Sequence, residues 1–421
     1  MTMKQLLMGR ANCPCGMNHA CPTRYVEIAE NACDILPELT LQFEHILVVA
    51  DRNTYAVAGE LVAKKIGVRM AGCLIYEREG VLVPNEEAIA ELRACVTPET
   101  DLILGIGSGV INDLCKYVSF EANLPYYIVA TAPSMDGYAS KGAALILNGM
   151  KVTLNAQVPS VIIADLNILK NAPMEMIRAG YGDIIGKYSC LNDWKLANVV
   201  NGEYLCEFAV NATYEEVEKT VALADGLLVR DAQAVGALME ALVAVGILMA
   251  YVGNSRPASG SEHHLSHYFE ITGLVRDENY FPHGIDVCFS AIETAKLRDE
   301  LLNMEDISSL KPHFDAADYE KNIRRIYGPI ADEILALQKK LGWYDVDRVS
   351  VYREKWDEIR AVLADAPRAQ DMQALVERIG LSYDHFLSFY GEQKRADAKW
   401  YAKDLKDRYS VLWLYYDLRC Q

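Results

Sequence analysis

The sequence DLILGIGSGVIND at residues 101–113 runs from an apolar stretch into a glycine-rich turn and then into the start of a helix. Its first part, Asp101–Gly105, predicts a buried strand, and a helical pattern continues to Glu121. Glycines in such a turn allow a pyrophosphate to approach the backbone, and the N–H groups at the helix start can face the anion. The spacing differs from the G-x-G-x-x-G pattern of dinucleotide sites. An ordinary glycine turn after a strand is therefore the alternative.

Strands alternate with helices on both sides of this segment. The predicted strands are His45–Ala50, Met70–Tyr76 and Pro125–Ala130. The predicted helices cover residues 24–40, the segment that follows Asp51-Arg-Asn-Thr54 through Lys65, and Asn85–Val96. This order is typical of parallel βαβ units, whose ligands lie at the carboxyl ends of the strands. Asp51 at one such end could accept hydrogen bonds from ribose hydroxyls, or it could cap the following helix.

The pattern changes after Asp165. Ala143–Asp165 contains short apolar runs around Asn148-Gly149, which indicates a hairpin, and nearly everything beyond it is helical. We therefore expect an α/β dinucleotide-binding domain over residues 1–168 and an all-α domain for metal and substrate over residues 169–421. The expected anchors of the last helices are Trp356, Trp400 and Trp413.

Composition limits the classes of partner. The chain has 421 residues, a net charge of −17 and 51% hydrophobic residues, which fits a two-domain globular protein. Its negative field repels phosphate backbones and anionic membranes, so we expect no nucleic-acid or membrane partner. Met1–Arg10 carries no export signal, which predicts a cytoplasmic protein. Ala234–Val252 is the most membrane-like segment, but Glu240 interrupts it and we favour a buried core helix.

An N-terminal segment gathers four possible metal ligands, Cys13, Cys15, His19 and Cys21, within nine positions. Such soft ligands could hold a structural zinc ion. The spacing fits no common zinc module, however, and an N-terminal arm without a metal is equally consistent. The other cysteines are scattered and, without a signal peptide, indicate reduced thiols.

Four of the 8 histidines lie in a second group, at positions 263, 264, 267 and 283. A Ser-Gly-Ser sequence before them can start a helix, on which His263 and His267 would share one face. Two or three converging imidazoles would suit zinc, nickel, iron or copper. A helix with surface histidines is the alternative.

The stretch AGYGDIIGKY at residues 179–188 contains a further possible ligand. Asp183 and Lys187 are four residues apart, so a solvated ion pair on one helix face would explain them. Their neighbours are apolar and glycine-rich, which instead favours a buried carboxylate. A carboxylate beside imidazoles would make a catalytic metal set.

Five motifs together resemble the superfamily of iron-type alcohol dehydrogenases, glycerol dehydrogenases and dehydroquinate synthases, and within it the sn-glycerol-1-phosphate dehydrogenase family. They are GSGVIND at 107–113, TAPSMDG at 131–137, Gly182-Asp183, RPASGSEH at 256–263 and His283-Gly284. Each motif is weak alone, but five in the same order are specific. The resemblance spans residues 45 to 290, and it leaves the cysteine-rich N-terminus and the last helices without a role.

The resemblance implies a site for one divalent metal, zinc or nickel with iron possible, bound by Asp183, His263 and His283. Asp183 and His267 would act in catalysis and, with Asp136, would contact the substrate. His264 adjoins the proposed ligand, and we prefer His263 because it follows Ser-Gly-Ser-Glu. The implied contacts of NAD(H) or NADP(H) are Asp51, Gly107, Ser108, Gly109, Val110, Ile111, Asn112, Asp113, Thr131, Ala132, Pro133, Ser134 and Ser140.

The implied activity is the metal-dependent, reversible reduction of dihydroxyacetone phosphate to sn-glycerol 1-phosphate in glycerophospholipid metabolism. The substrate would be a small phosphorylated three-carbon compound, and Arg256 or Lys187 would offset its phosphate charge. The family precedent also implies a homodimer. The alternatives are a glycerol or polyol dehydrogenase, a sugar-phosphate cyclase of the same superfamily, and a metal- and NAD-binding protein without activity.

Overall fold

The computed structural model describes residues 1–147 and 150–419 of the chain. Two compact units make up the chain, the first from residues 1–184 and 211–254 and the second from residues 185–210 and 255–421. The division falls within two helices, α7 (Met174–Ile185) and α9 (Glu207–Ala222).

The predicted fold class, an α/β part followed by a helical part, is confirmed. Every element that the structure describes after strand β8 (Val161–Asp165) is helical. The predicted domain boundary near residue 168 marks this change of secondary structure. The compact units first divide the chain later, after residue 184, so the boundary remains a prediction.

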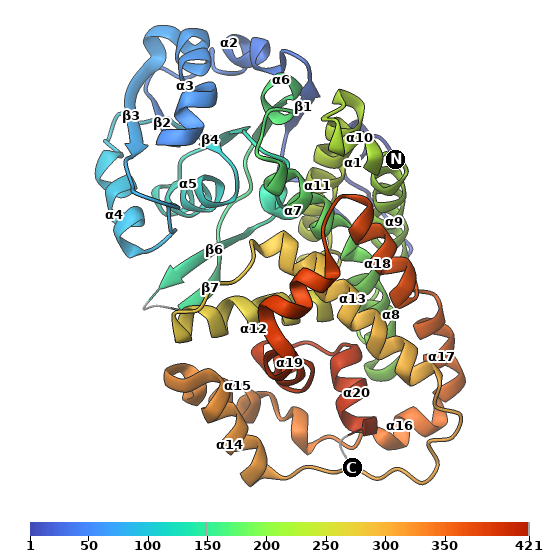
Figure 1. Ribbon diagram of the computed structural model, residues 1–421. Coiled ribbons are helices and arrows are strands. Elements are labelled where there is room, and N and C mark those ends of the chain that lie inside the picture. The colour runs from blue at the N-terminus through green and yellow to red at the C-terminus, as the bar shows by residue number, and fades with distance from the viewer. Residues whose placement is uncertain (148–149, 420–421) are drawn as a thin grey trace. The chain divides into compact units, whose positions relative to one another are not determined.

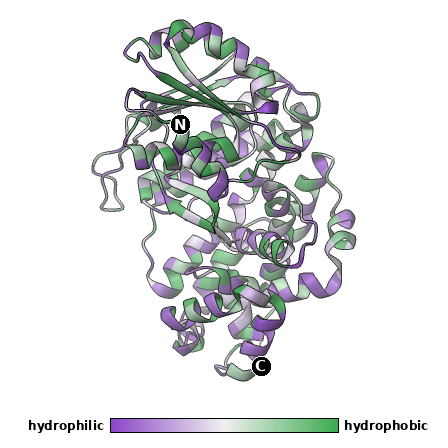
Figure 2. Cartoon of the chain, turned by 90° about the vertical axis from the view of Figure 1, so that its left-hand side faces the viewer, coloured by the Kyte–Doolittle hydropathy of each residue, from purple (hydrophilic) through white to green (hydrophobic). Residues whose placement is uncertain are grey.

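Six parallel strands form the main sheet of the first unit (Figure 1). In spatial order they are β1 (Tyr25–Ala29), β8, β5 (Tyr126–Ala130), β4 (Leu102–Gly107), β2 (Ile46–Asp51) and β3 (Met70–Tyr76). The central strands β4 and β5 are buried along their whole length because helices cover both of their faces, and the sheet is mostly hydrophobic (Figure 2). The strands predicted around β2, β3, β4 and β5 are confirmed.

The helices that accompany this sheet belong to the same unit. They are α1 (Met3–Leu7), α2 (Leu36–Leu39), α3 (Arg52–Ile66), α4 (Glu86–Cys95), α5 (Gly109–Ala122), α6 (Leu166–Leu169), α10 (Ala224–Leu228) and α11 (Ala232–Val252). Alternate residues of β2 and β4, including Val48 and Leu104, pack with α3 in one core. Gly105 points to the other face, where an added Cβ would lie 3.2 Å from Cys115 of α5.

The segment at residues 24–40 was predicted to be helical, and this is wrong for its first part. Tyr25–Ala29 is the edge strand β1, paired in parallel with β8. A 3-10 helix, Ala32–Ile35, and the four-residue α2 follow it. A five-residue strand with half-buried side chains throughout carries too little periodicity to identify it, and its pairing with β8 stabilises it instead.

The predicted hairpin is present as strands β6 (Gly142–Leu147) and β7 (Met150–Asn155), which pair antiparallel. Its predicted turn, Asn148-Gly149, lies outside the described residues. Helix α11 is long and apolar enough to cross a membrane, but 78% of its most apolar window is buried within the structure. This burial agrees with the core-helix interpretation.

The second unit consists of helices and the short segments that join them (Figure 1). The α-helices are α8 (Lys187–Asn201), α12 (Ser261–Arg276), α13 (His283–Leu302), α14 (Ala316–Tyr327), α15 (Ala331–Leu341), α16 (Val349–Glu354), α17 (Trp356–Ala364), α18 (Ala369–Arg378), α19 (Tyr383–Tyr401) and α20 (Val411–Arg419). Trp413 of α20 is fully buried and stacks on Trp343, with ring centroids 5.5 Å apart. It is the anchor that the sequence predicted, whereas Trp356 and Trp400 are only partly buried.

Candidate active site

The first unit brings three of the predicted cofactor segments to one edge of its sheet. β2, β4 and β5 are neighbours, and their carboxyl ends carry Asp51, Gly107 and Thr131. The backbone N–H of Thr131 donates to the carbonyl of Gly107 over 3.1 Å. The next strand in sequence, β3, lies on one side of β2, and the strand after it, β4, lies on the other side. This reversal of strand order is the switch point at which open parallel sheets bind ligands.

Asp51 performs the helix-capping role that was one of its two predicted alternatives. Its Oδ1 accepts the backbone N–H groups of Asn53 and Thr54 at 2.8 and 2.9 Å, and these bonds close the start of α3. The cap involves only one carboxylate oxygen. Oδ2 can therefore still accept a hydrogen bond from a ribose hydroxyl.

The glycine turn leaves the start of α5 available to an anion. Ser108 stands at the N-cap position but makes no side-chain hydrogen bond to the helix start. The first N–H groups of a helix have no partner within the helix and attract negative charge. Ser108, Gly109 and Val110 are half-buried, whereas Ile111 and Asn112 are buried. The first three can therefore meet a cofactor directly, while the other two pack within the unit.

Lys116 was not predicted from the sequence, although it holds one of the predicted site segments in place. Its side chain is fully buried, and its Nζ donates to the carbonyls of Gly137 and Gly142 at 2.5 and 3.0 Å and to Ser140 Oγ at 3.2 Å. Burial lowers its pKa, although nearby Asp113 opposes this shift. Lys116 thus holds the loop of the predicted residues 136–140 against α5. The sequence signal that could have identified Lys116 is its spacing of four residues from Asn112, which places both side chains on one face of α5.

Close packing explains why α7 is rich in glycine. A Cβ added to Gly180 would lie 1.9 Å from the carbonyl oxygen of Pro133, so the helix touches the predicted cofactor loop at backbone distance. One turn further on, the buried Asp183 accepts the backbone N–H of Asp136 at Oδ2 over 2.9 Å. This buried carboxylate excludes the surface interpretation of Asp183 and joins two residues that were predicted to contact substrate.

The second unit gathers three of the four clustered histidines. The ring centroids of His263 and His283 lie 5.1 Å apart, those of His267 and His283 5.4 Å, and those of His263 and His267 6.2 Å. His263 and His267 share a face of α12, as predicted, and His283 is the first residue of α13. Ring nitrogens of His263 and His283 approach within 4.8 Å, close enough to bind one ion.

Glu262 orients the first of these imidazoles and was not predicted. It is fully buried, and its Oε1 lies 2.7 Å from His263 Nδ1 while also accepting the N–H of Gly260 at 2.9 Å. When Glu262 is ionised its carboxylate only accepts, so Nδ1 then carries the proton and Nε2 is the nitrogen that can bind a metal. Burial raises the pKa of Glu262 to about 7.

The position of His264 favours His263 as the candidate ligand. His264 is fully buried, and neither of its ring nitrogens has a hydrogen-bond partner among the described residues. Burial, with further contributions from Lys406, Arg408 and Arg256, lowers its pKa well below the ordinary value, so the ring is neutral. It belongs to the core of the second unit.

Arg256 and Lys187 have structural partners. Arg256 forms a double ion pair with Glu203 and donates to the carbonyl of Tyr409 at 2.9 Å. Its charge is thus already neutralised, which argues against the hypothesis that it binds a substrate phosphate. Lys187 is buried and donates to the carbonyl of Ala258 at 2.9 Å, which ties α8 to the loop before α12.

Known proteins match both the sequence and the fold. The family described as iron-containing alcohol dehydrogenase matches residues 27–173. The glycerol-1-phosphate dehydrogenase [NAD(P)+] of Halalkalibacterium halodurans is 35% identical over 301 residues, which cover 69% of this chain and 74% of the relative. The chain belongs to the glycerol-1-phosphate dehydrogenase family. The enzyme of the same name from Geobacillus thermodenitrificans is 31% identical over 80% of this chain and 78% of its own length.

The fold of this family member is shared with more distant dehydrogenases. The crystal structure of a probable glycerol dehydrogenase from Sinorhizobium meliloti covers 93% of this chain and 99% of its own, with a TM-score of 0.55 and 18% identity. At that identity the similarity concerns the fold alone.

Proposed function

We propose that this protein is an NAD(P)-dependent oxidoreductase that reduces dihydroxyacetone phosphate to sn-glycerol 1-phosphate, reversibly, at a bound divalent metal. The observation that carries the proposal is the imidazole cluster of α12 and α13, in which Glu262 holds His263 by its Nδ1. The names of the family relatives, which state both the substrate and the cofactor, support it.

The proposed metal ligands are Asp183, His263 and His283. Their donor atoms fit a divalent transition metal, because two neutral imidazoles and one carboxylate form a common catalytic set with open positions. Asp183 supplies a buried carboxylate, and Glu262 orients the imidazole of His263, as outer carboxylates commonly do for metal-binding histidines. Zinc or nickel, with iron possible, would supply Lewis-acid polarisation of the substrate's C2 carbonyl.

The proposed cofactor site is the carboxyl edge of β2, β4 and β5. The N–H groups at the start of α5 would bind the pyrophosphate, and Asp51 Oδ2 would accept from a ribose hydroxyl. The 131–134 loop would line the same edge, and Ser140 would be held there by Lys116. NAD(P)H bound there would supply the hydride that C2 accepts.

His267 is the proposed proton donor, directly or through a bound water. It is half-buried and lies on the same face of α12 as His263, and it has no place in the metal set. A group in this position can hold a proton near the carbonyl oxygen while hydride reaches the carbon. Asp136 and Asp183 would contact the substrate beside it.

The test is oxidation of NADH and of NADPH with dihydroxyacetone phosphate, using metal-stripped protein and protein refilled with zinc or nickel. The proposal expects turnover that depends on metal and yields the 1-phosphate enantiomer. A His267→Gln variant should lower kcat while it keeps its bound metal. Oxidation of unphosphorylated polyols alone, or consumption of a heptulosonate phosphate, would instead assign the chain to a polyol dehydrogenase or a cyclase.

We also propose a cytoplasmic homodimer. The net charge of −17 supports the absence of nucleic-acid and membrane partners. Sedimentation of the purified protein measures its mass directly, and a monomer at working concentration would reject the dimer.

A further inference from the structure

The cysteine-rich N-terminal segment folds into a closed loop. Arg10 and His19 exchange two backbone hydrogen bonds of 2.8 and 2.9 Å, which bring its ends together. Within it, the carbonyl of Cys13 accepts the N–H of Gly16 at 2.9 Å, and Gly16 has a φ of +86°. A residue with a side chain rarely adopts that conformation. The Cys-Pro-Cys-Gly sequence thus makes a tight turn with both thiols on it.

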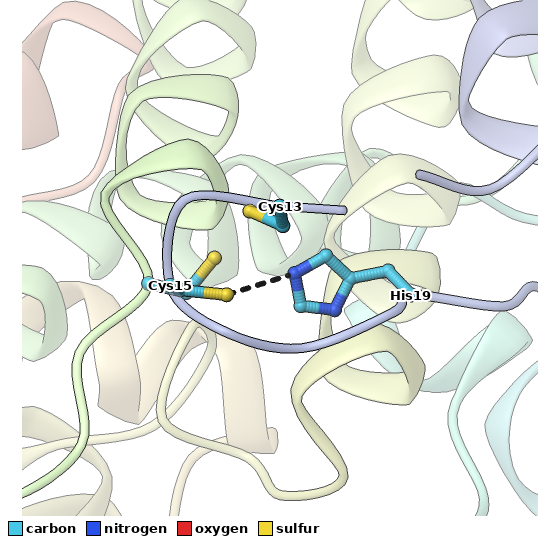
Figure 3. Close-up of side chains that lie close together, drawn as sticks. Cys13, Cys15 and His19 are labelled. Carbon is cyan, nitrogen blue, oxygen red and sulfur yellow. Dashed lines mark hydrogen bonds between the residues drawn. The ribbon is translucent and has the colours of Figure 1, made fainter. Parts of the chain in front are cut away.

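Three soft donors converge in this loop (Figure 3). Ligand atoms of Cys13, Cys15 and His19 all lie within 4.8 Å of one another, and Cys15 Sγ is 3.3 Å from His19 Nε2. Cys13 and His19 are buried, with exposed fractions of 5% and 4%, and Cys15 is half-buried. The group is therefore enclosed by the protein.

The imidazole of His19 is held in the tautomer that a metal requires. Its Nδ1 lies 3.0 Å from the backbone carbonyl of Tyr251, and its ring stacks on the Tyr251 ring with centroids 5.2 Å apart. A carbonyl oxygen only accepts, so Nδ1 carries the proton and Nε2, the nitrogen that faces the thiols, has the lone pair. Metal-binding histidines commonly have such an acceptor on the other nitrogen.

The location of that carbonyl is also favourable for a cation. Tyr251 lies in the last turn of α11, where carbonyl groups have no donor within the helix. His19 satisfies one of them. The carboxyl end of a helix carries partial negative charge, which stabilises positive charge nearby.

We propose that Cys13, Cys15 and His19 bind a structural zinc ion that fixes the N-terminal loop, in addition to the metal of the proposed active site. Structural zinc is tetrahedral and prefers cysteine and histidine ligands, so a fourth donor is required. A further thiolate is the donor type that would complete such a set. Cys21 stands outside this group of donors and serves as the matched control.

The test measures metal by mass spectrometry and by cobalt substitution of the full-length protein. Thiolate ligands give cobalt an intense charge-transfer absorption, whereas the nitrogen and oxygen ligands of the proposed active site do not. Wild-type protein and a His263→Ala/His283→Ala variant should both show this absorption. Cys13→Ser/Cys15→Ser and His19→Gln should each lose it, together with one zinc equivalent per chain, and Cys21→Ser should keep both.

A cobalt spectrum of the wild-type protein without thiolate absorption would overturn the proposal, even if the cysteine variants failed to fold. Unchanged zinc content in Cys13→Ser/Cys15→Ser would overturn it too. Because the His263→Ala/His283→Ala variant separates the two metals, either site can fail without affecting the other.

Discussion

Glu262 offers the sharpest test of the proposed active site. Replacing it with alanine removes the acceptor of His263 Nδ1–H, a contact of 2.7 Å, from a position with no exposure to solvent. The imidazole could then adopt either tautomer and rotate. Loss of such an outer partner weakens metal binding about 10- to 100-fold, or about 1.4–2.7 kcal/mol. We expect this loss in the Kd for zinc, measured by chelator competition on metal-stripped protein.

Two further variants separate orientation from folding. In the wild type, Glu262 Oε1 accepts from both His263 and Gly260. The Glu262→Gln variant retains one such acceptor oxygen, so its zinc affinity should stay closer to that of the wild type. Asp193→Asn disturbs the same helix start, where Asp193 accepts the N–H of Ser261 at 2.6 Å, without touching an imidazole. It should lower the melting temperature and leave the Kd unchanged. The reasoning is refuted if Glu262→Ala stays within about threefold of wild type, or if Asp193→Asn loses as much affinity.

The remaining predictions concern close packing and buried charges, and thermal denaturation measures their effects on stability. Gly180→Ala should destabilise the folded protein by about 1–3 kcal/mol or more, because its Cβ would lie 1.9 Å from the Pro133 carbonyl oxygen. The control Gly236→Ala, whose Cβ would have 3.5 Å of clearance, should be neutral or stabilising. Equal effects of the two substitutions would contradict the close packing at Gly180. Lys116→Met should cost about 1–3 kcal/mol by removing the buried amine that donates to the Gly137 and Gly142 carbonyls, and should raise the KM for NAD(P)H. An unchanged KM would separate this loop from the cofactor. Lys403→Met should cost about 3–5 kcal/mol because it leaves Asp404, 2.9 Å from Lys403 Nζ, buried without its cationic partner. Lys403→Met/Asp404→Leu should recover most of it, and a double variant no better than the single one would contradict that account.

Local sequence patterns were sufficient for most of the first unit. The runs that became β2, β4 and β5 are apolar without interruption, and only a strand buried on both faces suits such a pattern. The shared face of His263 and His267 follows from helical periodicity alone. In these cases the information lies within a few residues of the feature.

The features that escaped prediction depend on distant parts of the chain. β1 is a strand because β8, more than a hundred residues later, pairs with it. Lys116 was not predicted, because only the fold places the loop carbonyls around its amine. Glu262 was not predicted either, because the local sequence pattern does not show that it is buried. Only its complete burial against His263 distinguishes it.

His263 and His19 show two ways of fixing an imidazole for a metal. The acceptor for His263 is the preceding residue, so its orientation survives as long as the start of α12 is folded. The acceptor for His19 is a carbonyl 232 residues away, so its orientation exists only while the N-terminal loop is docked on α11. Zinc at the loop would therefore be coupled to that docking, since each stabilises the other. Amide hydrogen exchange of residues 10–19 should become faster after zinc removal. Mutation of the N-terminal loop should leave the exchange protection of the first turn of α12 unchanged. If the loop exchanges equally with and without zinc, the metal does not hold it in place.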